Sequence, residues 1–141
     1  MNLVSFLGPS GTFSQEAAEK ISDNLVSLCT IPAVMDSVER KNCKYGVVPI
    51  ENSIEGPVGL TLDSLAHNFN LKIFKEIIIP INHCLLVNPE ANLSDITDIY
   101  SHNQAISQCQ GYIFEKKFNQ HFTLFTAKAC ELIKIKITVQ L

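Results

Sequence analysis

Residues 3–14 read LVSFLGPSGTFS, a stretch that joins a short apolar run, a Gly-Pro break and the start of a polar helix. The run Leu3–Leu7 predicts a β-strand that the Gly-Pro pair ends. Thr12 followed by Gln15 resembles a capping box at the start of a helix. The apolar residues that follow recur at helical spacing, at Phe13, Ala17, Ala18 and Ile21. A strand, a turn and a helix in this order form the repeating unit of an α/β protein.

The same alternation continues along the chain. Further strands are predicted over 25–31, 45–50 and 122–125, and another strand is predicted to end at Ile99 and Tyr100. Further helices are predicted over 33–42, 58–69, 105–113 and 127–133. The helix over 58–69 has one apolar face, made of Val58, Leu62, Leu65, Ala66 and Phe69.

The stretch Ile73–Leu86 is strongly β-forming but long for a single strand, so we expect two strands joined by a crossover at Pro80. We therefore divide the chain into a lobe of residues 1–79 and a lobe of residues 80–141. Strands and helices that alternate over short connections favour a mostly parallel sheet with helices on its faces. Ligands of such sheets bind beyond the carboxyl ends of the strands.

The composition excludes several classes of protein. Apolar residues make up 46% of the 141 residues and charged residues 18%, which is typical of a folded domain rather than a disordered chain. The 11 basic and 14 acidic residues give a net charge of −3 without a basic block, so we expect no nucleic-acid partner. No apolar run is long enough to span a membrane, and the N-terminal residues do not resemble a signal peptide. We therefore expect a cytoplasmic protein with no membrane partner.

The cysteines and histidines indicate no metal site. The number of cysteines is odd and no two stand as C-x-x-C, so neither a zinc knuckle nor a disulfide framework is expected. We expect reduced thiols that mostly pack as small hydrophobes. His83 and Cys84 lie in an apolar stretch and are predicted to be core residues, whereas His67 and His121 stand alone.

Three predicted strand-to-helix junctions hold most of the unusual polar residues. In the first, Ser10, Gly11 and Thr12 precede a helix whose free N–H groups and positive dipole end could seat a carboxylate or phosphate. A simple turn with a helix cap would show the same residues.

In the second junction, the strand over 45–50 delivers Glu51, Asn52 and Ser53 to its carboxyl end. A carboxylate there could hold or donate a proton, and an amide offers both a donor and an acceptor. A solvated loop is the alternative interpretation.

In the third junction, Ser101, Gln104 and Gln108 stand at i, i+3 and i+7, so a helix would place them on one stripe. Neutral donors near a helix start suit a small anion, although a solvated helix face has the same pattern. His102 could carry a proton or could be an exposed cap residue.

In their order and spacing, these junctions resemble three signatures of the prephenate dehydratase family. The matching segments are GPSGTFS at 8–14, GVVPIENSIEG at 46–56 and SHNQAISQC at 101–109, with Asn103 where the family usually has proline. The resemblance implies two Rossmann-like lobes around a cleft, as in periplasmic-binding-protein-like folds. The second lobe and the return of the chain to the first lobe are expected to be incomplete.

The resemblance also implies the decarboxylating dehydration of prephenate to phenylpyruvate in L-phenylalanine biosynthesis. It implies no metal or organic cofactor, and a homodimer in the complete family protein. It assigns catalytic roles to Glu51 and Asn52. The substrate-binding residues that it implies are Ser10, Gly11, Thr12, Ser53, Ser101, Gln104 and Gln108.

The chain departs from the family at one motif. A downstream Thr-Arg-Phe motif supplies the threonine that is the family's usual catalytic candidate, but this sequence has no Thr-Arg pair and its only arginine is Arg40. We expect a truncated or frame-shifted C-terminal part, no regulatory ACT-type domain, and little or no activity of the chain alone. The alternatives are a dehydratase of arogenate, a non-catalytic remnant that binds a small anion, and a fold shared without the function.

Overall fold

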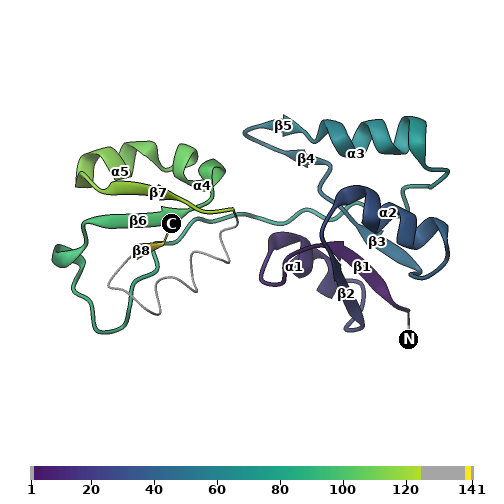
Figure 1. Cartoon of the computed structure of the whole chain (residues 1–141), viewed down its shortest axis with the longest axis horizontal. Helices are drawn as coiled ribbons and strands as arrows, with labels where there is room; N and C mark the ends of the chain where they lie inside the picture. Colours follow the sequence, from purple (N-terminus) through teal and green to yellow (C-terminus); the bar gives the residue numbers. More distant parts are fainter. Residues whose placement is uncertain (1, 125–138, 141) are drawn as a thin grey trace. The chain divides into compact units, whose positions relative to one another are not determined.

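The computed structural model describes residues 2–124 and 139–140. The chain divides into two compact units, Met1–Pro80 and Ile81–Leu141, which we call unit 1 and unit 2 (Figure 1). Each unit has a three-stranded parallel sheet with helices packed against it, so the predicted α/β class is confirmed.

The strand β1 (Val4–Leu7) is the centre of the sheet in unit 1. It pairs in parallel with β2 (Leu25–Leu28) on one side and with β3 (Tyr45–Val47) on the other. Side chains alternate between the two faces of a strand, and β1 follows this rule. Val4 and Phe6 pack with Ala18 of α1 (Phe13–Glu19), whereas Ser5 contacts α2 (Ile31–Glu39).

Small residues allow α2 to pack closely on the sheet. The hydroxyl oxygen of Ser37 lies 2.8 Å from that of the buried Ser5 and 2.7 Å from the carbonyl oxygen of Val34. A Cβ atom on Gly46 of β3 would stand 2.8 Å from Val34 Cγ1 and 3.0 Å from Val38 Cγ2. Two valines of α2 therefore occupy the space that a side chain at position 46 would need.

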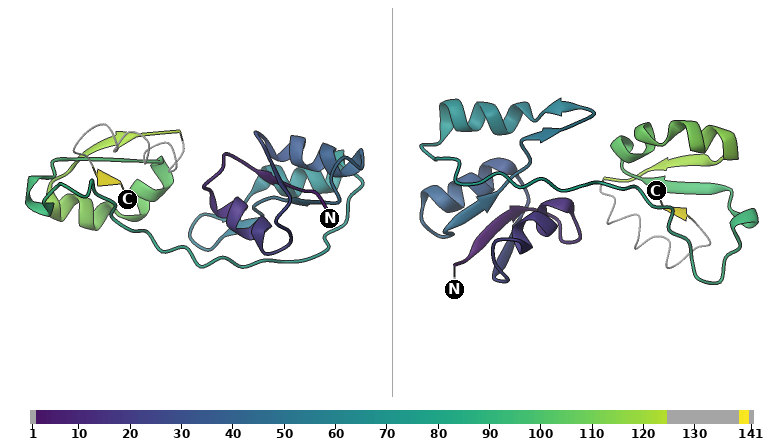
Figure 2. Two further views of the ribbon diagram at one scale, coloured as in Figure 1. Left: turned by 90° about the horizontal axis from the view of Figure 1, so that it is seen from below. Right: turned by 180° about the vertical axis from the view of Figure 1, so that it is seen from behind.

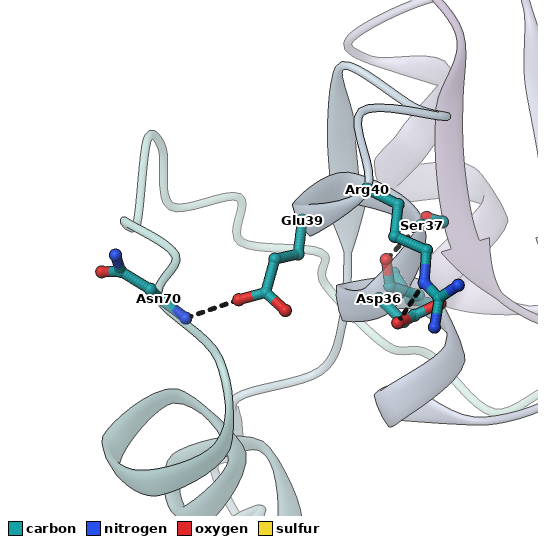
Figure 3. Close-up of polar contacts among 6 residues, drawn as sticks. Asp36, Ser37, Glu39, Arg40 and Asn70 are labelled. Carbon is teal, nitrogen blue, oxygen red and sulfur yellow. Dashed lines mark hydrogen bonds and ion pairs between the residues drawn. The ribbon is translucent and has the colours of Figure 1, made fainter.

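The C-terminal end of α2 binds a later segment of the chain. The backbone N–H of Asn70 donates to Glu39 Oε1 at 2.8 Å, as Figure 3 shows. One residue further along, Arg40 pairs with Asp36 at 2.8 Å, and this pairing raises the pKa of the exposed guanidinium. The contact between Glu39 and Asn70 holds the chain two residues after the end of the helical segment at Asn68.

Helix α2 begins earlier than the sequence indicated, and β2 ends earlier. Pro32 lies in the first turn of α2, where a proline costs no helical hydrogen bond. Thr30 caps this helix, because its hydroxyl accepts from the N–H of Ala33.

The predicted helix over 58–69 has two parts, α3 (Gly59–Asp63) and the π-helical turn η1 (Ser64–Asn68). Its buried residues are Thr61 and Ser64, whereas Leu62 of the predicted apolar face is 42% exposed. The prediction of the face was incomplete because the Thr61 hydroxyl donates to the Pro49 carbonyl at 2.7 Å, which turns Thr61 inward. The change to π-helical winding also rotates the side chains that follow.

The predicted pair of strands over Ile73–Leu86 is wrong for the described residues. This segment is an irregular trace with no more than an isolated bridge at Leu86 (Figure 2). Most of its apolar side chains stay outside the cores, and Ile78 is 78% exposed, although Leu85 packs against the core of unit 2. A β-forming sequence becomes a strand only where a neighbour supplies the ladder, and no described residue does so here.

Unit 2 is built around β6 (Asp98–Ser101), which pairs in parallel with β7 (Asn119–Phe122) and β8 (Val139–Gln140). The predicted helix over 105–113 is divided at Cys109 into α4 (Asn103–Gln108) and α5 (Gln110–Lys116). A short 3-10 turn, η2 (Leu93–Asp95), precedes the sheet. The core of the unit consists of Ile96, Ile99, Ile106 and Ile113, with Leu85, Cys109 and Phe118 packed against it.

The C-terminal predictions are only partly covered by these elements. The strand predicted over 122–125 lies earlier, at Asn119–Phe122. Phe125 and the helix predicted over 127–133 lie outside the described residues.

Polar residues join β6 to β7 on one face of this sheet. His121 Nε2 lies 2.7 Å from Asp98 Oδ1, and the His121 ring stacks on Tyr100 with 4.5 Å between centroids. His121 therefore does not stand alone, contrary to the sequence-based expectation. Hydrogen bonds from Thr97 and then from His121 lower the pKa of Asp98 below its usual value.

We predict that Gly46→Ala lowers the free energy of unfolding by about 1–3 kcal/mol, because the added methyl group forces Val34 and Val38 apart. Urea unfolding measures the change. Gly59→Ala is the matched control in the same unit, since a Cβ there meets nothing within 4 Å and its stability should be unchanged or slightly higher. Equal midpoints for both variants would contradict this account of the packing.

We predict that Thr97→Val raises the pKa of Asp98 toward its usual value, because the largest cause of the shift is removed. An NMR titration of the Asp98 carboxyl carbon measures it. A lowered pKa stabilises the folded state above the unfolded value of 3.8, and this contribution is lost as the pH falls below that value. The contribution is below about 1 kcal/mol, since the pair is partly exposed. An unchanged titration in the variant would show that Thr97 is not the cause.

Candidate functional site

The first predicted junction is a loop between β1 and α1 that borders an open hollow. The hollow measures about 440 Å³, and its lining consists of Ser10, Gly11, Thr12, Phe13, Gln15, Glu16 and Glu19. Gly11 has a φ of 83°, a conformation that glycine adopts without strain. Nearby, a side chain on Gly8 would overlap Ser27, so the loop passes directly against β2. The carboxylates of Glu16 and Glu19 make one side of the hollow acidic.

The capping box predicted at this loop is present in a shifted form. The Thr12 hydroxyl accepts from the N–H of Gln15 at 3.4 Å and donates to the Leu7 carbonyl at 3.4 Å. The Gln15 side chain accepts from the N–H of Gly11 at 2.7 Å, one residue before the cap. Both polar partners of Thr12 are thus backbone groups, and its hydroxyl primarily shapes the loop.

The sequence predicted that Glu51 and Asn52 lie at the carboxyl end of a strand of the parallel sheet, but the structure places them elsewhere. The strand β3 ends at Val47, and these residues form β4 (Glu51–Asn52), which pairs with β5 (Gly56–Pro57) in a short antiparallel hairpin. The strand is shorter than predicted because the Pro49 and Ile50 carbonyls bond to α3 residues or to its cap instead of continuing the sheet.

Asn52 closes the turn of this hairpin with its own side chain. Asn52 Oδ1 accepts from the N–H groups of Ile54 at 2.9 Å and Glu55 at 3.4 Å. Its acceptor atom is therefore occupied, and no described residue accepts from its Nδ2 group. Glu51 and Ser53 are exposed on either side. The hairpin presents two carboxylates, those of Glu51 and Glu55, with one hydroxyl and one amide donor to solvent.

The two junctions of unit 1 begin at the same edge of its sheet. Because β1 and β3 are parallel neighbours, the chain leaves both strands in the same direction, at Gly8 and Val48. This edge is where ligands of parallel sheets bind. The sheet therefore explains why Ser10–Thr12 and Glu51–Ser53 start from one side of the unit.

The third junction joins β6 to α4 in unit 2. Ser101 is the last residue of β6 and is fully buried, so the predicted helical stripe from Ser101 to Gln108 does not form. Gln104 and Gln108 lie one helical turn apart on α4 and are half-buried. His102 caps α4, with its Nδ1 accepting from the N–H of Gln104 at 3.4 Å. The cap interpretation of His102 is therefore confirmed.

Sequence reasoning missed a contact between His83 and Gln108. Their side chains are joined at 2.8 Å between His83 Nε2 and Gln108 Oε1. His83 and Cys84 are exposed, so the prediction that they are core residues was wrong. The segment is irregular instead of a strand in a buried sheet, which leaves both side chains outside. The only signal in the sequence is that His83 stands two residues before Leu85, the position that reaches the core.

The described cysteines are free thiols, and only some of them are packed. Cys43 is buried and Cys109 half-buried, but Cys29 and Cys84 are exposed, contrary to the expectation. Burial raises the pKa of the Cys109 thiol, which keeps it protonated and a poor nucleophile. No three His, Cys, Asp or Glu residues gather as a metal site within residues 2–124. None of the helices in this part of the chain is long and apolar enough to cross a membrane.

Comparison with known proteins agrees with this arrangement. Residues 4–139 match the sequence model of the prephenate dehydratase family. The chain is 36% identical over 136 residues to prephenate dehydratase of Lactococcus lactis, which covers 93% of this chain and 48% of that protein. It is 38% identical over 135 residues to the bifunctional chorismate mutase/prephenate dehydratase of Aquifex aeolicus, covering 92% of this chain and 36% of that protein.

A solved structure shows the same fold. The prephenate dehydratase of Arthrobacter aurescens in complex with L-Phe superposes with a TM-score of 0.85 at 28% identity, covering 98% of this chain and 48% of that one. The chain belongs to the prephenate dehydratase family. It spans about half the length of the prephenate dehydratases that it matches.

We predict that Asn52→Asp keeps the hairpin and Asn52→Ala loosens it. Aspartate retains the oxygen that accepts from Ile54 and Glu55, whereas alanine removes it. Amide hydrogen exchange at Ile54 measures the difference, with faster exchange only in the alanine variant. Equal protection in both variants would show that the side chain of Asn52 does not hold the turn.

Proposed function

We propose that this chain is a prephenate-binding part of a prephenate dehydratase, which converts prephenate to phenylpyruvate with loss of water and carbon dioxide. The observation that carries the proposal is that the family match covers residues 4–139 and includes all three junctions. Unit 1 corresponds to the family's first lobe, residues 1–79, and unit 2 to part of its second lobe, residues 80–141. A homodimeric state and a cytoplasmic location, with no cofactor, belong to the same proposal.

The chemistry needs few protein groups. When the ring carboxylate leaves as carbon dioxide, its bonding electron pair moves into the ring, and the ring hydroxyl departs as water after it gains a proton. The product ring is aromatic, which drives the reaction. A protein therefore has to seat the anionic substrate and supply a proton or a hydrogen bond to the leaving oxygen.

We assign these tasks according to the polar atoms that have no hydrogen-bond partner among the described residues. Glu51 is an exposed carboxyl group to which we assign the proton transfer, and Asn52 adds an Nδ2 donor beside it. Gln108 offers the amide donor of α4, with Gln104 one turn before it. Ser10, Gly11 and Ser53 add exposed polar groups, whereas Thr12 and the buried Ser101 act by shaping the loops that carry the others.

Because the sequence has no Thr-Arg pair, we expect a low rate of phenylpyruvate formation. The chain has one arginine, Arg40, which pairs with Asp36 on α2. The hydroxyl that the family resemblance assigns to catalysis thus has no counterpart in this sequence. We therefore propose that the chain alone binds prephenate but forms phenylpyruvate slowly or not at all.

Calorimetric titration of the purified chain with prephenate tests the binding. We predict saturable binding, which Glu51→Gln and Gln108→Ala each weaken about tenfold, equivalent to about 1.4 kcal/mol. Glu90→Gln, in an exposed loop of unit 2, is the control and should bind as the unchanged chain does. The absence of saturable binding would overturn the proposal. Phenylpyruvate formation is followed in the same samples, and turnover at a normal enzymatic rate would refute the role assigned to the missing motif.

A further inference from the structure

His83 lies against a residue of the proposed site without belonging to any of the three junctions. His83 Nε2 and Gln108 Oε1 are 2.8 Å apart, although the residues are far apart in the sequence. A glutamine Oε1 atom can only accept, so the Nε2 atom of His83 carries the proton and donates it. In this contact Gln108 turns its oxygen toward His83, and a proton on Nε2 completes the hydrogen bond.

The backbone around His83 holds the imidazole in place. Leu85, two residues later, packs against the core cluster of unit 2, to which α4 contributes Ile106, two residues before Gln108. The packing of Leu85 ties this segment to the core that α4 also helps to form, so the hydrogen bond between His83 and Gln108 lies close in sequence to an apolar contact with the core.

The consequence for Gln108 is a fixed direction of its donor group. An amide side chain that is free to rotate presents its oxygen and its NH₂ group almost equally. With Oε1 bound to His83, the NH₂ group of Gln108 points away, and no described residue accepts from it. A group in this state recognises an acceptor such as a carboxylate oxygen and offers nothing to a second donor.

We propose that His83 is a positioning residue, which orients the amide of Gln108 so that its NH₂ group donates to a carboxylate oxygen of prephenate. This inference rests on the proposed function, because it assigns the ligand atom that Gln108 meets. Positioning lowers the cost of ordering the amide when the ligand binds.

The first test is prephenate affinity, measured by calorimetry on the full 141-residue chain. His83→Phe keeps a ring but removes the donor, and its affinity should fall about fivefold, the usual worth of one hydrogen bond. His83→Gln supplies a new donor and should stay within about twofold of the unchanged chain. His67→Phe is the control, an exposed histidine in unit 1. Unchanged affinity in His83→Phe overturns the inference.

A double variant tests whether His83 acts through Gln108. In a Gln108→Ala background, His83→Phe should cause no further loss, because the amide that it orients is absent. A further fivefold loss in this background would show that His83 acts on the ligand directly and would overturn the positioning role.

NMR spectra of the imidazole and amide groups separate a failure of this inference from a failure of the proposed function. If the chain does not bind prephenate, the proposed function fails, but the His83 contact is still measured. We expect the Nε2-protonated tautomer of His83, and we expect the Gln108 NH₂ signals to shift in His83→Phe but not in His67→Phe. A His83 protonated only at Nδ1, or Gln108 signals that do not shift, would overturn the positioning role whatever the result with prephenate.

Discussion

The pairing of β1 with a parallel strand on each side is the constraint on which unit 1 depends. As the central strand, β1 (Val4–Leu7) has neighbours at both edges and helices on both faces. Its side chains alternate between the two faces, so one short strand serves both helices. Val4 and Phe6 form the apolar face that α1 covers, whereas the small Ser5 lets α2 approach, with Gly46 providing space on the neighbouring strand. Parallel pairing also sends the chain out of β1 and β3 at one edge of the sheet, where two polar junctions begin.

Hydrogen bonds inside the junctions decide which atoms remain available to a ligand. Thr12 and His102 use their acceptors on helix N–H groups, and Asn52 uses its oxygen on the hairpin turn. Gln108 uses its oxygen on His83. In Asn52 and Gln108 the remaining groups are therefore donors. Each of these donors suits an oxygen acceptor such as a carboxylate, which agrees with the chemistry proposed for this chain.

The sequence predicted well those elements that depend on interactions within a few residues. The strand at the N-terminus, the cap at Thr12 and the helix that follows it depend on local spacing and on hydrogen bonds three residues long. The prediction failed where a distant partner decides. Ile73–Leu86 has the composition of strands but no described neighbour forms a ladder with it, and the Pro49 carbonyl turned Thr61 inward and left Leu62 exposed.

The sequence by itself determined the α/β class, the family and the three groups of candidate residues, because motif order and short-range periodicity are properties of the chain alone. Only the tertiary structure decided what each polar atom does. Ser101 became a buried strand end, Asn52 a turn residue, and His83 the partner of Gln108. The physical reason is that a side-chain hydrogen bond is directional and short. Its partner is therefore whichever group the packed sheet, helix and core bring within about 3 Å.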